Sequence, residues 1–565
     1  TWILLKRLHM SKFIFITGGV VSSLGKGIAA GAIGLILKEC GLTIRNQKLD
    51  PYLNVDPGTM SPSQHGEVYV TDDGTEADLD LGHYERFTGV PANKFTNFTA
   101  GSIYYDVLTK ERRGDYLGAT VQIVPHITDH LKQCILSLES DDVDVIISEV
   151  GGTVGDIEGL FFLETLRQIA FERGRDNVMF VHVTLIPHLN STDEIKTKPT
   201  QHSVQKLREV GISPDVLICR TVRNLDINVK RKISLFCNVP VDAVIDEKDV
   251  DKSIYEVPFV LLNQKLDKII AERLKLKVKK PNLSEWQKII DQIDHTKNHT
   301  KIGIIGKYAG LADSYKSVVE SLQHAAIANN STIEIKIIPS EDLEKEGNMK
   351  LLHDLDGILV PGGFGDRGVQ GKLNSIRYAR EKLVPFLGIC LGMQCATIEF
   401  ARNVCKMQGA HSTEFDPKTN YAIISLLEEQ KKIVNLGGTM RLGSYPCSIL
   451  KNTKASAAYQ KYNISERHRH RYEFNNEYKE VLEKKGMVFS GTSPDKTLIE
   501  IVELKGPPWF LGCQFHPEFK SRPVDPHPLF KEFVKASIKC QKGSAKKSSK
   551  VLSKKRVTKK KLKNK

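Results

Sequence analysis

The feature that most constrains the fold of this chain is a regular alternation of short apolar runs with stretches of helical pattern. Four apolar runs lie in the first 270 residues, at positions 13–17, 143–148, 179–185 and 216–219. Helical stretches such as 28–40 and 159–172 lie between them. Runs rich in Val and Ile are typical of strands buried on both faces of a parallel sheet, with helices covering those faces. The sequence therefore predicts an α/β domain built on a doubly wound parallel sheet.

The same alternation returns in the second half of the chain. Its expected strands are residues 302–305, 333–338, 357–360 and 386–389. A polar stretch with a helical pattern separates the two halves. We therefore expect two α/β domains with doubly wound parallel sheets, at 10–272 and 301–540, joined by a linker at 273–300.

The net charge of +14 lies almost entirely at the end of the sequence. Residues 542–565 contain twelve Lys or Arg and no Asp or Glu, so the other 541 residues carry only about +2. Runs of like charge are usually solvated and disordered, so we expect a basic tail at 541–565. Weak polyanion binding by this tail, and a tail without any partner, both stay open. Residues 1–9 have no signal-peptide pattern and are expected to play no part in the fold.

Cysteine usage and hydropathy argue against three classes of protein. The ten cysteines are scattered without a CxxC pair, which argues against a zinc framework and against a secreted disulfide framework. A reducing, cytoplasmic location fits this usage better. No apolar run approaches the roughly 20 residues of a membrane helix, so the sequence predicts no membrane span.

A glycine-rich loop follows the first expected strand. The segment GGVVSSLGKG, residues 18–27, leads into a helix that begins near Ile28. Such a loop aims backbone N–H groups at a phosphate, and the helix N-terminus adds its dipole. Lys26 is placed to reach the outer phosphates of a nucleotide. The strand–loop–helix context therefore predicts a phosphate-binding loop.

This loop departs from the Walker A pattern in two ways. Five residues rather than four separate Gly19 from Gly25, and Gly27 stands where Walker A has the Ser or Thr that binds Mg²⁺. A metal ion would therefore need ligands from other elements. Carboxylates at strand ends suit Mg²⁺, and we expect Asp80 and Glu149 to supply them.

A second group of anion-binding candidates is the segment KTKPTQHS, residues 196–203, where two lysines flank a threonine and a proline stiffens the turn. Lys48 and Lys232 are further candidates for a site that holds two triphosphates. One lysine is a weak signal because most lysines are solvated. The prediction rests on the combination.

A nucleophile is indicated in the second half by PFLGICLGMQ, residues 385–394. Gly388 and Gly392 flank Cys390 at the end of an expected strand, a pattern typical of the strained turn that exposes a nucleophile. The following helix N-terminus lowers a thiol pKa. His516 and Glu518, in QFHPEF, are the expected base and the group that orients it. Backbone N–H groups near residues 363 and 391 are candidates for an oxyanion hole.

Together these motifs resemble the CTP synthase family, in which an amidoligase (synthetase) domain precedes a class I glutamine amidotransferase domain. The resemblance runs from about Met10 to Cys540. The elbow and triad alone would indicate only a glutamine amidotransferase. This family is selected by DLDLGHYERF, at 78–87, and KTKPTQHSV, at 196–204. The segments EVGGTVGDIE, LGGTMRLG and RHRHRYE also appear in the order typical of the family.

The resemblance implies binding residues as well as the triad. The expected ATP contacts are Ser23, Leu24, Gly25, Lys26, Gly27 and Asp80. The expected UTP or CTP contacts are Ser22, Asp156, Ile157, Glu158, Lys196, Thr197, Lys198, Pro199, Thr200, Gln201 and Lys232. The expected glutamine contacts are Gly363, Leu391, Gly392, Met393, Gln394, Glu414 and Arg471. Asp80 and Glu149 are the implied Mg²⁺ ligands.

The resemblance also implies a reaction and its regulation. ATP phosphorylates the 4-oxygen of UTP, and ammonia released from glutamine at Cys390 displaces that phosphate to give CTP. GTP is implied as an allosteric activator that acts near Lys316 and Arg367, and CTP as a feedback inhibitor. The implied assembly is a homotetramer.

Two other classes of function stay open at this point. Another two-domain glutamine-dependent amidotransferase-synthetase would share the loop and the glutaminase but would not need DLDLGHYERF or KTKPTQHSV. A nucleotide-switch ATPase could use the basic tail to bind nucleic acid. The Cys–His–Glu set argues against the switch, which has no use for a glutaminase.

Overall fold

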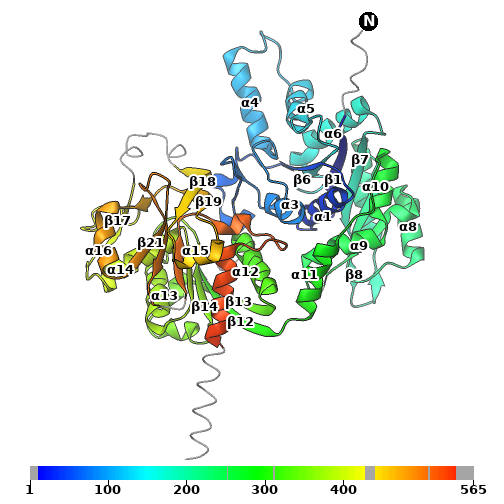
Figure 1. The fold of residues 1–565 in the computed structure, drawn as a ribbon. Coiled ribbons are helices and arrows are strands. Elements are labelled where there is room, and N and C mark those ends of the chain that lie inside the picture. The colour runs from blue at the N-terminus through cyan, green and yellow to red at the C-terminus, as the bar shows by residue number, and fades with distance from the viewer. Residues whose placement is uncertain (1–9, 251, 309–311, 427–439, 507–508, 542–565) are drawn as a thin grey trace, which may run out of the picture. The chain divides into compact units, whose positions relative to one another are not determined.

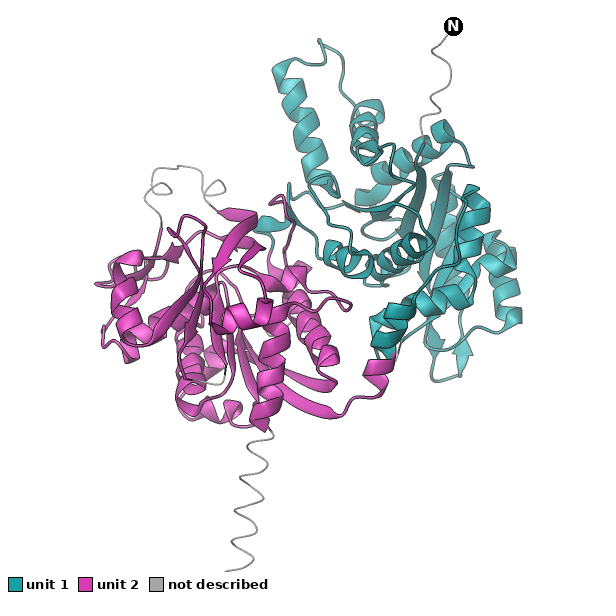
Figure 2. Ribbon diagram, in the orientation of Figure 1, with its two compact units in different colours: residues 1–60, 76–290 teal, residues 61–75, 291–565 magenta. Residues whose placement is uncertain are grey.

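The computed structural model describes residues 10–250, 252–308, 312–426, 440–506 and 509–541 (Figure 1). The expectations for residues 1–9 and for the lysine-rich residues 542–565 lie outside this part of the chain. Two compact units are present, Thr1–Met60 with Glu76–Ile290 and Ser61–Thr75 with Asp291–Lys565 (Figure 2). The second unit thus includes a segment, 61–75, that comes from the first half of the sequence.

The first unit is built on a seven-stranded sheet in which all neighbouring strands are parallel. This confirms the parallel α/β prediction for the first half. The central strand, β1, places the glycine-rich loop at the carboxyl edge of the sheet, where ligands bind in such folds. In spatial order the strands are β11 (Val244–Lys248), β10 (Val216–Thr221), β7 (Val178–Leu185), β1 (Lys12–Gly18), β6 (Val145–Val150), β2 (Ile44–Asp50) and β5 (Asn97–Thr99).

Helices cover both faces of this sheet. Phe13 and Phe15 of β1 pack into a core with residues of α5 and α6, whereas α1 packs against α3 and α9 (Figure 1). The helices are α1 (Lys26–Glu39), α3 (Asp80–Thr88), α4 (Ala100–Arg113), α5 (Thr128–Leu136), α6 (Leu160–Arg173), α7 (Lys198–Glu209), α8 (Ile227–Cys237), α9 (Val257–Asn263), α10 (Leu266–Leu274) and α11 (Ser284–Asp294).

The stretch interpreted as a linker, 273–300, contains α11 and the start of the next strand. Trp286 of α11 is buried and stacks on Phe87 of α3, with ring centroids 5.6 Å apart. Part of this stretch is therefore packed against the first unit, and the exact domain boundaries stay a prediction.

The second unit is also an α/β unit, built on a nine-stranded sheet whose parallel part agrees with the prediction and whose antiparallel part was not predicted. Five strands are parallel: β13 (Ser331–Pro339), β12 (Asn298–Gly306), β14 (Gly357–Val360), β15 (Phe386–Ile389) and β23 (Phe510–Cys513). Four more continue the sheet in antiparallel fashion: β22 (Ile499–Leu504), β21 (Met487–Thr492), β18 (Arg441–Ile449) and β19 (Asn463–His470).

The helices of the second unit lie on both faces of its sheet, over two separate apolar cores. Among them are α12 (Lys316–Ala328), α13 (Val369–Lys382), α14 (Leu391–Asn403), α15 (Lys454–Tyr459) and α16 (Lys479–Lys484), and residues 528–541 form a further helical stretch. The segment 61–75 adds the short α2 (Pro62–His65) and β3 (Tyr69–Val70), which pairs with nothing in the large sheets.

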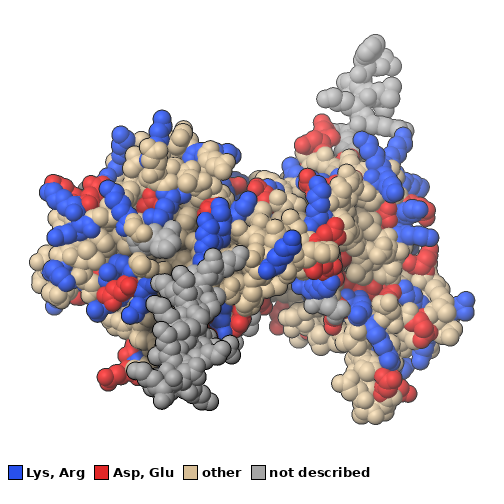
Figure 3. All heavy atoms as spheres, turned by 60° about the horizontal axis from the view of Figure 1, so that its bottom comes forward, with Lys and Arg blue, Asp and Glu red and all other residues tan. Residues whose placement is uncertain are grey.

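Charged side chains, cysteines and helix lengths can be compared with what the composition predicts. On the face shown in Figure 3, acidic and basic side chains lie interspersed over both units. None of the ten cysteines, all of which lie in the described residues, forms a disulfide. None of the helices in the described ranges has both the length and the apolar character that crossing a membrane requires.

Candidate active sites

The glycine-rich loop joins β1 to α1 in the first unit. Gly25 precedes α1 with φ 84° and ψ 26°, a left-handed conformation that glycine adopts without a Cβ penalty. Lys26 is the first residue of α1, and its Nζ donates a hydrogen bond to the Gly152 carbonyl at 2.6 Å. Burial lowers the pKa of Lys26. A cation at this helix N-terminus, beside free loop N–H groups, suits a bound phosphate.

Lys48 of β2 lies among four carboxylates next to this loop. Its Nζ is 3.0 Å from Glu149, 3.8 Å from Asp50 and 3.9 Å from Asp78, and it also contacts Asp80. Burial alone would lower the pKa of Lys48, but Asp80 and Glu149 hold it well above its usual value. Sequence reasoning named Lys48, Asp80 and Glu149 but missed Asp50 and Asp78.

The four carboxylates outnumber the two lysines beside them. Burial, together with the nearby Asp50 charge, raises the pKa of Asp78 to about 8, and burial raises that of Asp50 to about 6. Tyr84 of α3 donates a hydrogen bond to Glu149, which fixes that carboxylate at the sheet edge. This excess of buried negative charge fits a divalent cation. No group of three or more His, Cys, Asp or Glu side chains that could hold a metal ion is found among the described residues.

The structure gives a reason for glycine at position 27. A Cβ added to Gly27 would lie 2.1 Å from Oδ1 of Asp80. Asp80, at the start of α3, therefore occupies the space where a Walker A loop would place its hydroxyl-bearing side chain. The Asp80 carboxylate fits beside the loop only because residue 27 has no side chain. The absence of a loop hydroxyl and the position of the expected metal ligand therefore have the same cause.

The residues expected to bind UTP or CTP all lie in the first unit. Residues 196 and 197 precede α7 and residues 198–201 form its first turn, in which Thr200 and Gln201 are buried. Residues 156–158 follow β6 and are exposed, and Lys232 is exposed on α8. No hydrogen bond or ion pair between Lys232 and the others is found among the described residues, and their joint role in binding UTP or CTP stays a prediction.

A buried hydrogen-bond relay connects the glycine-rich loop to α7. Thr17 Oγ1 lies 2.8 Å from Nδ1 of His182, and Nε2 of His182 lies 2.8 Å from Ser203 Oγ. Burial lowers the pKa of His182 to about 3, so the ring is neutral and bridges the two hydroxyls. Arg220, at the end of β10, was missed by sequence reasoning; its Nη1 lies 3.6 Å from the Cβ position of Gly25.

In the second unit, Cys390 lies in a sharp turn between β15 and α14. Its backbone has φ 51° and ψ −106°, a conformation that non-glycine residues rarely adopt. A Cβ on Gly392 would be 2.1 Å from the carbonyl oxygen of Val360, and one on Gly388 would be 2.7 Å from Gly392. These contacts explain why the turn needs both glycines.

His516 and Glu518 lie beside this cysteine. The Nδ1 of His516 is 2.7 Å from Glu518 Oε1. A Cβ added to Gly362 would lie 2.8 Å from Cε1 of His516 and 3.6 Å from Cβ of Cys390, so both side chains adjoin the same glycine. Burial lowers the pKa of His516, but the Glu518 carboxylate and a Cys390 thiolate outweigh burial and raise it to about 10. This arrangement places an imidazole, oriented by a carboxylate, beside the cysteine side chain, as a cysteine nucleophile and its base require.

The residues expected to bind glutamine surround this turn. Gly363 adjoins Leu391, whose Cδ2 lies 3.5 Å from the Gly363 Cβ position, and Glu414 accepts a hydrogen bond of 2.9 Å from the Gly365 N–H. Met393 is fully buried in the core, so only its backbone can meet a ligand. Gln394 is held by the Tyr472 carbonyl at 3.0 Å. Arg471 is partly buried.

Gln514 was not assigned a role from the sequence. Its Nε2 lies 3.8 Å from the Sγ of Cys390, and its Oε1 lies 3.3 Å from Nε2 of Gln394. It therefore joins the nucleophile to a residue of the expected glutamine pocket. The signal available in the sequence was its position two residues before His516 in QFHPEF.

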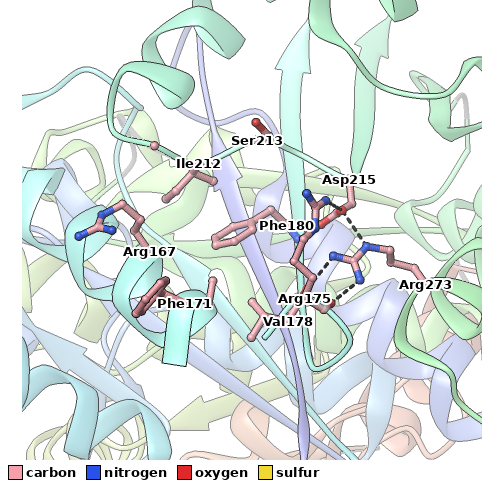
Figure 4. A pocket seen from close by; sticks show the side chains of 11 residues that line it. Arg167, Phe171, Arg175, Val178, Phe180, Ile212, Ser213, Asp215 and Arg273 are labelled. Atoms are coloured by element: carbon pink, nitrogen blue, oxygen red, sulfur yellow. Dashed lines mark hydrogen bonds and ion pairs between the residues drawn. The ribbon is translucent and has the colours of Figure 1, made fainter. Parts of the chain in front are cut away.

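A cavity of about 360 Å³ lies elsewhere in the first unit (Figure 4). It adjoins Val178, the first residue of β7, at the edge of the sheet opposite the glycine-rich loop. Three of its charged groups are paired with one another, since Arg273 and Arg175 both contact Asp215 (Figure 4), and the fourth, Arg167, pairs with Glu164 of α6. This cavity therefore does not belong to the expected nucleotide site.

The fold and the geometry of both sites fit one class of protein, a synthetase domain joined to a glutamine amidotransferase domain. Two family models match the chain, "CTP synthase N-terminus" over residues 12–276 and "Glutamine amidotransferase class-I" over residues 310–536. The chain belongs to the CTP synthase family. This membership leaves the other two classes of function without support.

Close relatives match over nearly their whole length. A CTP synthase of Caldanaerobacter subterraneus is 56% identical over 530 residues, covering 94% of this chain and 98% of the relative. A CTP synthase of Geobacillus kaustophilus is 56% identical over 531 residues, covering 94% of this chain and all of the relative. Among solved structures, the Trypanosoma brucei CTPS glutaminase domain with bound acivicin is 37% identical, with a TM-score of 0.41, and covers 42% of this chain and 94% of that one.

Proposed function

We propose that this protein makes CTP from UTP, with ATP as the activating substrate and glutamine as the source of ammonia. The proposal rests on one observation. This member of the CTP synthase family has both a glycine-rich loop beside a carboxylate cluster and a cysteine beside a His–Glu pair. The first site would activate UTP with ATP, and the second would release the ammonia that reacts with the activated UTP.

In the synthetase unit the reaction needs positioning and charge neutralisation rather than a protein nucleophile. ATP transfers its γ-phosphoryl group to the 4-oxygen of UTP, which turns a poor leaving group into phosphate. Lys26, at the loop, and Lys48, beside it, place positive charge where phosphate oxygens gather. Ammonia then forms the new bond to C4 as phosphate leaves, and loss of a proton gives CTP.

The carboxylate cluster fits Mg²⁺, and Asp80 and Glu149 are the residues that would hold it. Bound there, the ion would neutralise phosphate charge during phosphoryl transfer. Lys48 contacts both carboxylates and therefore orients them, and Tyr84 holds Glu149 by a hydrogen bond.

In the glutaminase unit Cys390 attacks the side-chain carbonyl of glutamine. The C–N bond breaks, His516 gives a proton to the leaving ammonia, and a glutamyl thioester stays on Cys390. Water, deprotonated by His516, then hydrolyses the thioester to glutamate. Glu518 keeps the His516 ring oriented through the hydrogen bond to Nδ1.

Further parts of the proposal concern regulation and assembly. GTP would activate the glutaminase near Lys316 and Arg367, and CTP would inhibit as product. A homotetramer is supported by large apolar side chains that are exposed in the first unit: Tyr105 on α4 is 61% exposed, Leu117 94% and Ile157 83%. A reducing, cytoplasmic location is also part of the proposal, and it rests on the scattered cysteines of the sequence, which form no CxxC pair.

Product analysis tests the central proposal. Purified protein is supplied with UTP, ATP, Mg²⁺ and glutamine, and each is left out in turn. We expect CTP only in the complete mixture, and ammonium chloride at alkaline pH should replace glutamine. CTP formed without ATP, or no CTP in the complete mixture, would contradict the proposal.

Gly27→Ala should weaken the synthetase step. The new Cβ would displace Asp80 from its place beside the loop, which we estimate to cost about 2 kcal/mol of transition-state stabilisation, roughly 30-fold in rate. Glutamine- and ammonia-dependent CTP synthesis should fall together, while hydrolysis of glutamine alone stays unchanged. Gly159→Ala is the matched control, since no atom lies within 4 Å of its Cβ position. Equal rates for the two variants would show that Asp80 does not need this space.

A further inference from the structure

The segment 61–75, here called the strap, is covalently part of the first half of the chain but packs in the second unit. The chain leaves the first unit after Met60 and returns at Glu76 (Figure 2). The strap contains no residue of the triad or of the predicted binding sets. Its contacts nevertheless lead to the triad by two separate routes.

The first route runs through Tyr69, which is 1% exposed. Its hydroxyl donates a hydrogen bond of 2.9 Å to the carbonyl oxygen of Phe519, and its ring meets the Phe519 ring edge-on, with centroids 5.0 Å apart. On its other side the Phe519 ring stacks on the ring of His516, at 5.3 Å and 14°. The strap therefore sets the position of the ring that lies against the expected general base.

Arg467 of β19 reinforces this route. Its backbone carbonyl accepts the His516 N–H at 2.7 Å, while its guanidinium donates to Tyr69 Oη at 2.8 Å, to the Val70 carbonyl at 3.1 Å and to Asp72 Oδ1 at 2.8 Å. The guanidinium is 2% exposed. A buried cation needs acceptors, and the strap supplies three of them. Losing these acceptors would disturb the residue that anchors the His516 backbone.

The second route runs through Glu67 and α12. Both carboxylate oxygens of Glu67 accept hydrogen bonds of 2.9 Å from the Ser317 N–H, in the first turn of α12, where a negative charge is favourable. One turn later the hydroxyl of Ser321 donates a hydrogen bond of 2.7 Å to the Ser317 carbonyl and also lies 3.3 Å from the carbonyl oxygen of Glu518, so one proton is shared between the two acceptors. A further turn on, His324 Nδ1 lies 3.0 Å from Ser521 Oγ. The strap thus fixes the start of the helix that holds the turn carrying Glu518.

We propose that Tyr69, Arg467 and Glu67 are positioning residues for the glutaminase, and that the strap holds the His516–Glu518 pair in register with Cys390. The glutaminase centre is therefore complete only with fifteen residues from the first half of the chain. None of the three residues touches the reacting atoms; they act through Phe519, the His516 backbone and α12. This inference rests on the triad assignment in the proposed function.

The test uses the full chain with Tyr69→Phe, which removes one hydroxyl and keeps the ring. Tyr462→Phe is the matched control, because Tyr462 is 52% exposed in the same unit and its hydroxyl makes no hydrogen bond among the described residues. We expect Tyr69→Phe to lower kcat for glutamine hydrolysis about tenfold, the equivalent of one hydrogen bond to a charged group, with little change in KM for glutamine. Ammonia-dependent CTP synthesis should stay within about twofold of the parent.

A second measurement distinguishes positioning from a general loss of structure. The rate at which iodoacetamide alkylates Cys390 is measured against pH, with Cys390→Ala as the blank for the other cysteines. Because a displaced His516 stabilises the thiolate less, the midpoint of this profile should rise in Tyr69→Phe and, by more, in Arg467→Lys. Both variants should keep ammonia-dependent synthesis.

Two results would overturn the inference. One is a Tyr69→Phe variant with the same kcat and the same alkylation midpoint as Tyr462→Phe. The other is a parallel loss of glutamine hydrolysis and ammonia-dependent synthesis with an unchanged midpoint, because the strap would then act only on overall stability. A different result would contradict the proposed function, namely glutamine hydrolysis that persists in Cys390→Ala.

Discussion

Replacing Cys390 by alanine is expected to abolish glutamine-dependent CTP formation while leaving ammonia-dependent formation intact. Without the thiolate no glutamyl thioester forms, and we expect a loss of at least about 10⁴-fold in glutamine hydrolysis. The synthetase site uses residues of the first unit, which the substitution does not touch. The measurement is CTP production with glutamine at neutral pH and with ammonium chloride at alkaline pH.

Cys395→Ala is the matched control for this experiment. Cys395 is fully buried in the core five residues further along the same helix, and burial raises the pKa of its thiol to about 11, so it is not nucleophilic. Near-normal glutamine use is expected in this variant. If Cys390→Ala folded normally but lost both activities, its role would not be confined to the glutaminase.

The second large effect is expected from the carboxylate cluster. Asp80→Asn and Glu149→Gln each remove a negative charge from the expected Mg²⁺ ligands while keeping the side-chain shape. Both variants should lose about 10³-fold or more, near 4 kcal/mol, in glutamine- and ammonia-dependent CTP synthesis alike. Hydrolysis of glutamine alone should stay measurable, because the triad is intact.

The Mg²⁺ requirement gives this prediction a second readout. The Mg²⁺ concentration for half-maximal ammonia-dependent synthesis should rise in both variants if the carboxylates hold the ion. Asp142→Asn is a suitable control, because Asp142 lies exposed in the turn before β6. Full ammonia-dependent synthesis in Asp80→Asn or Glu149→Gln would exclude that carboxylate as an essential ligand.

Sequence reasoning worked best where a structural element is defined by its own residues. The apolar runs 357–360 and 386–389 coincide with β14 and β15, because a strand buried on both faces must be apolar at every position. The turn at Cys390 was visible for a similar reason. Its glycines are needed by contacts with backbone atoms close in the sequence and in the neighbouring strand.

The antiparallel strands β18 and β19 were missed because they carry many polar residues. β19 reads NISERHRH, and its His468 and His470 are buried side by side, with Nδ1 and Nε2 2.9 Å apart. Buried polar side chains that satisfy one another give no apolar pattern to detect. The sequence signal of such a strand lies in its partners, which are far away in the chain.

Gly27 shows a mixed outcome. The absence of a hydroxyl could be seen from the loop alone, and it led to the expectation, which stays a prediction, that a metal ligand comes from another element. That Asp80 fills the vacant space could not be seen, because the closeness of α1 and α3 results from packing. The strap was the hardest feature to predict. Nothing in its segment HGEVYV, residues 65–70, indicates that it packs against residues some 400 positions further along the chain.

That separation has a consequence for how the chain folds during synthesis. Tyr69 bonds to Phe519, 450 positions further on, and to Arg467, 398 positions further on. At about 5–20 residues per second, a ribosome needs roughly 20–90 seconds to reach these partners after Tyr69 is made. During that interval the strap has no native place to pack, although the strands on either side of it can already pair. Such distant contacts form slowly, so docking of the strap is a late event in the maturation of the newly made chain. Tyr69 stays without its native contacts until the last third of the sequence has been synthesised.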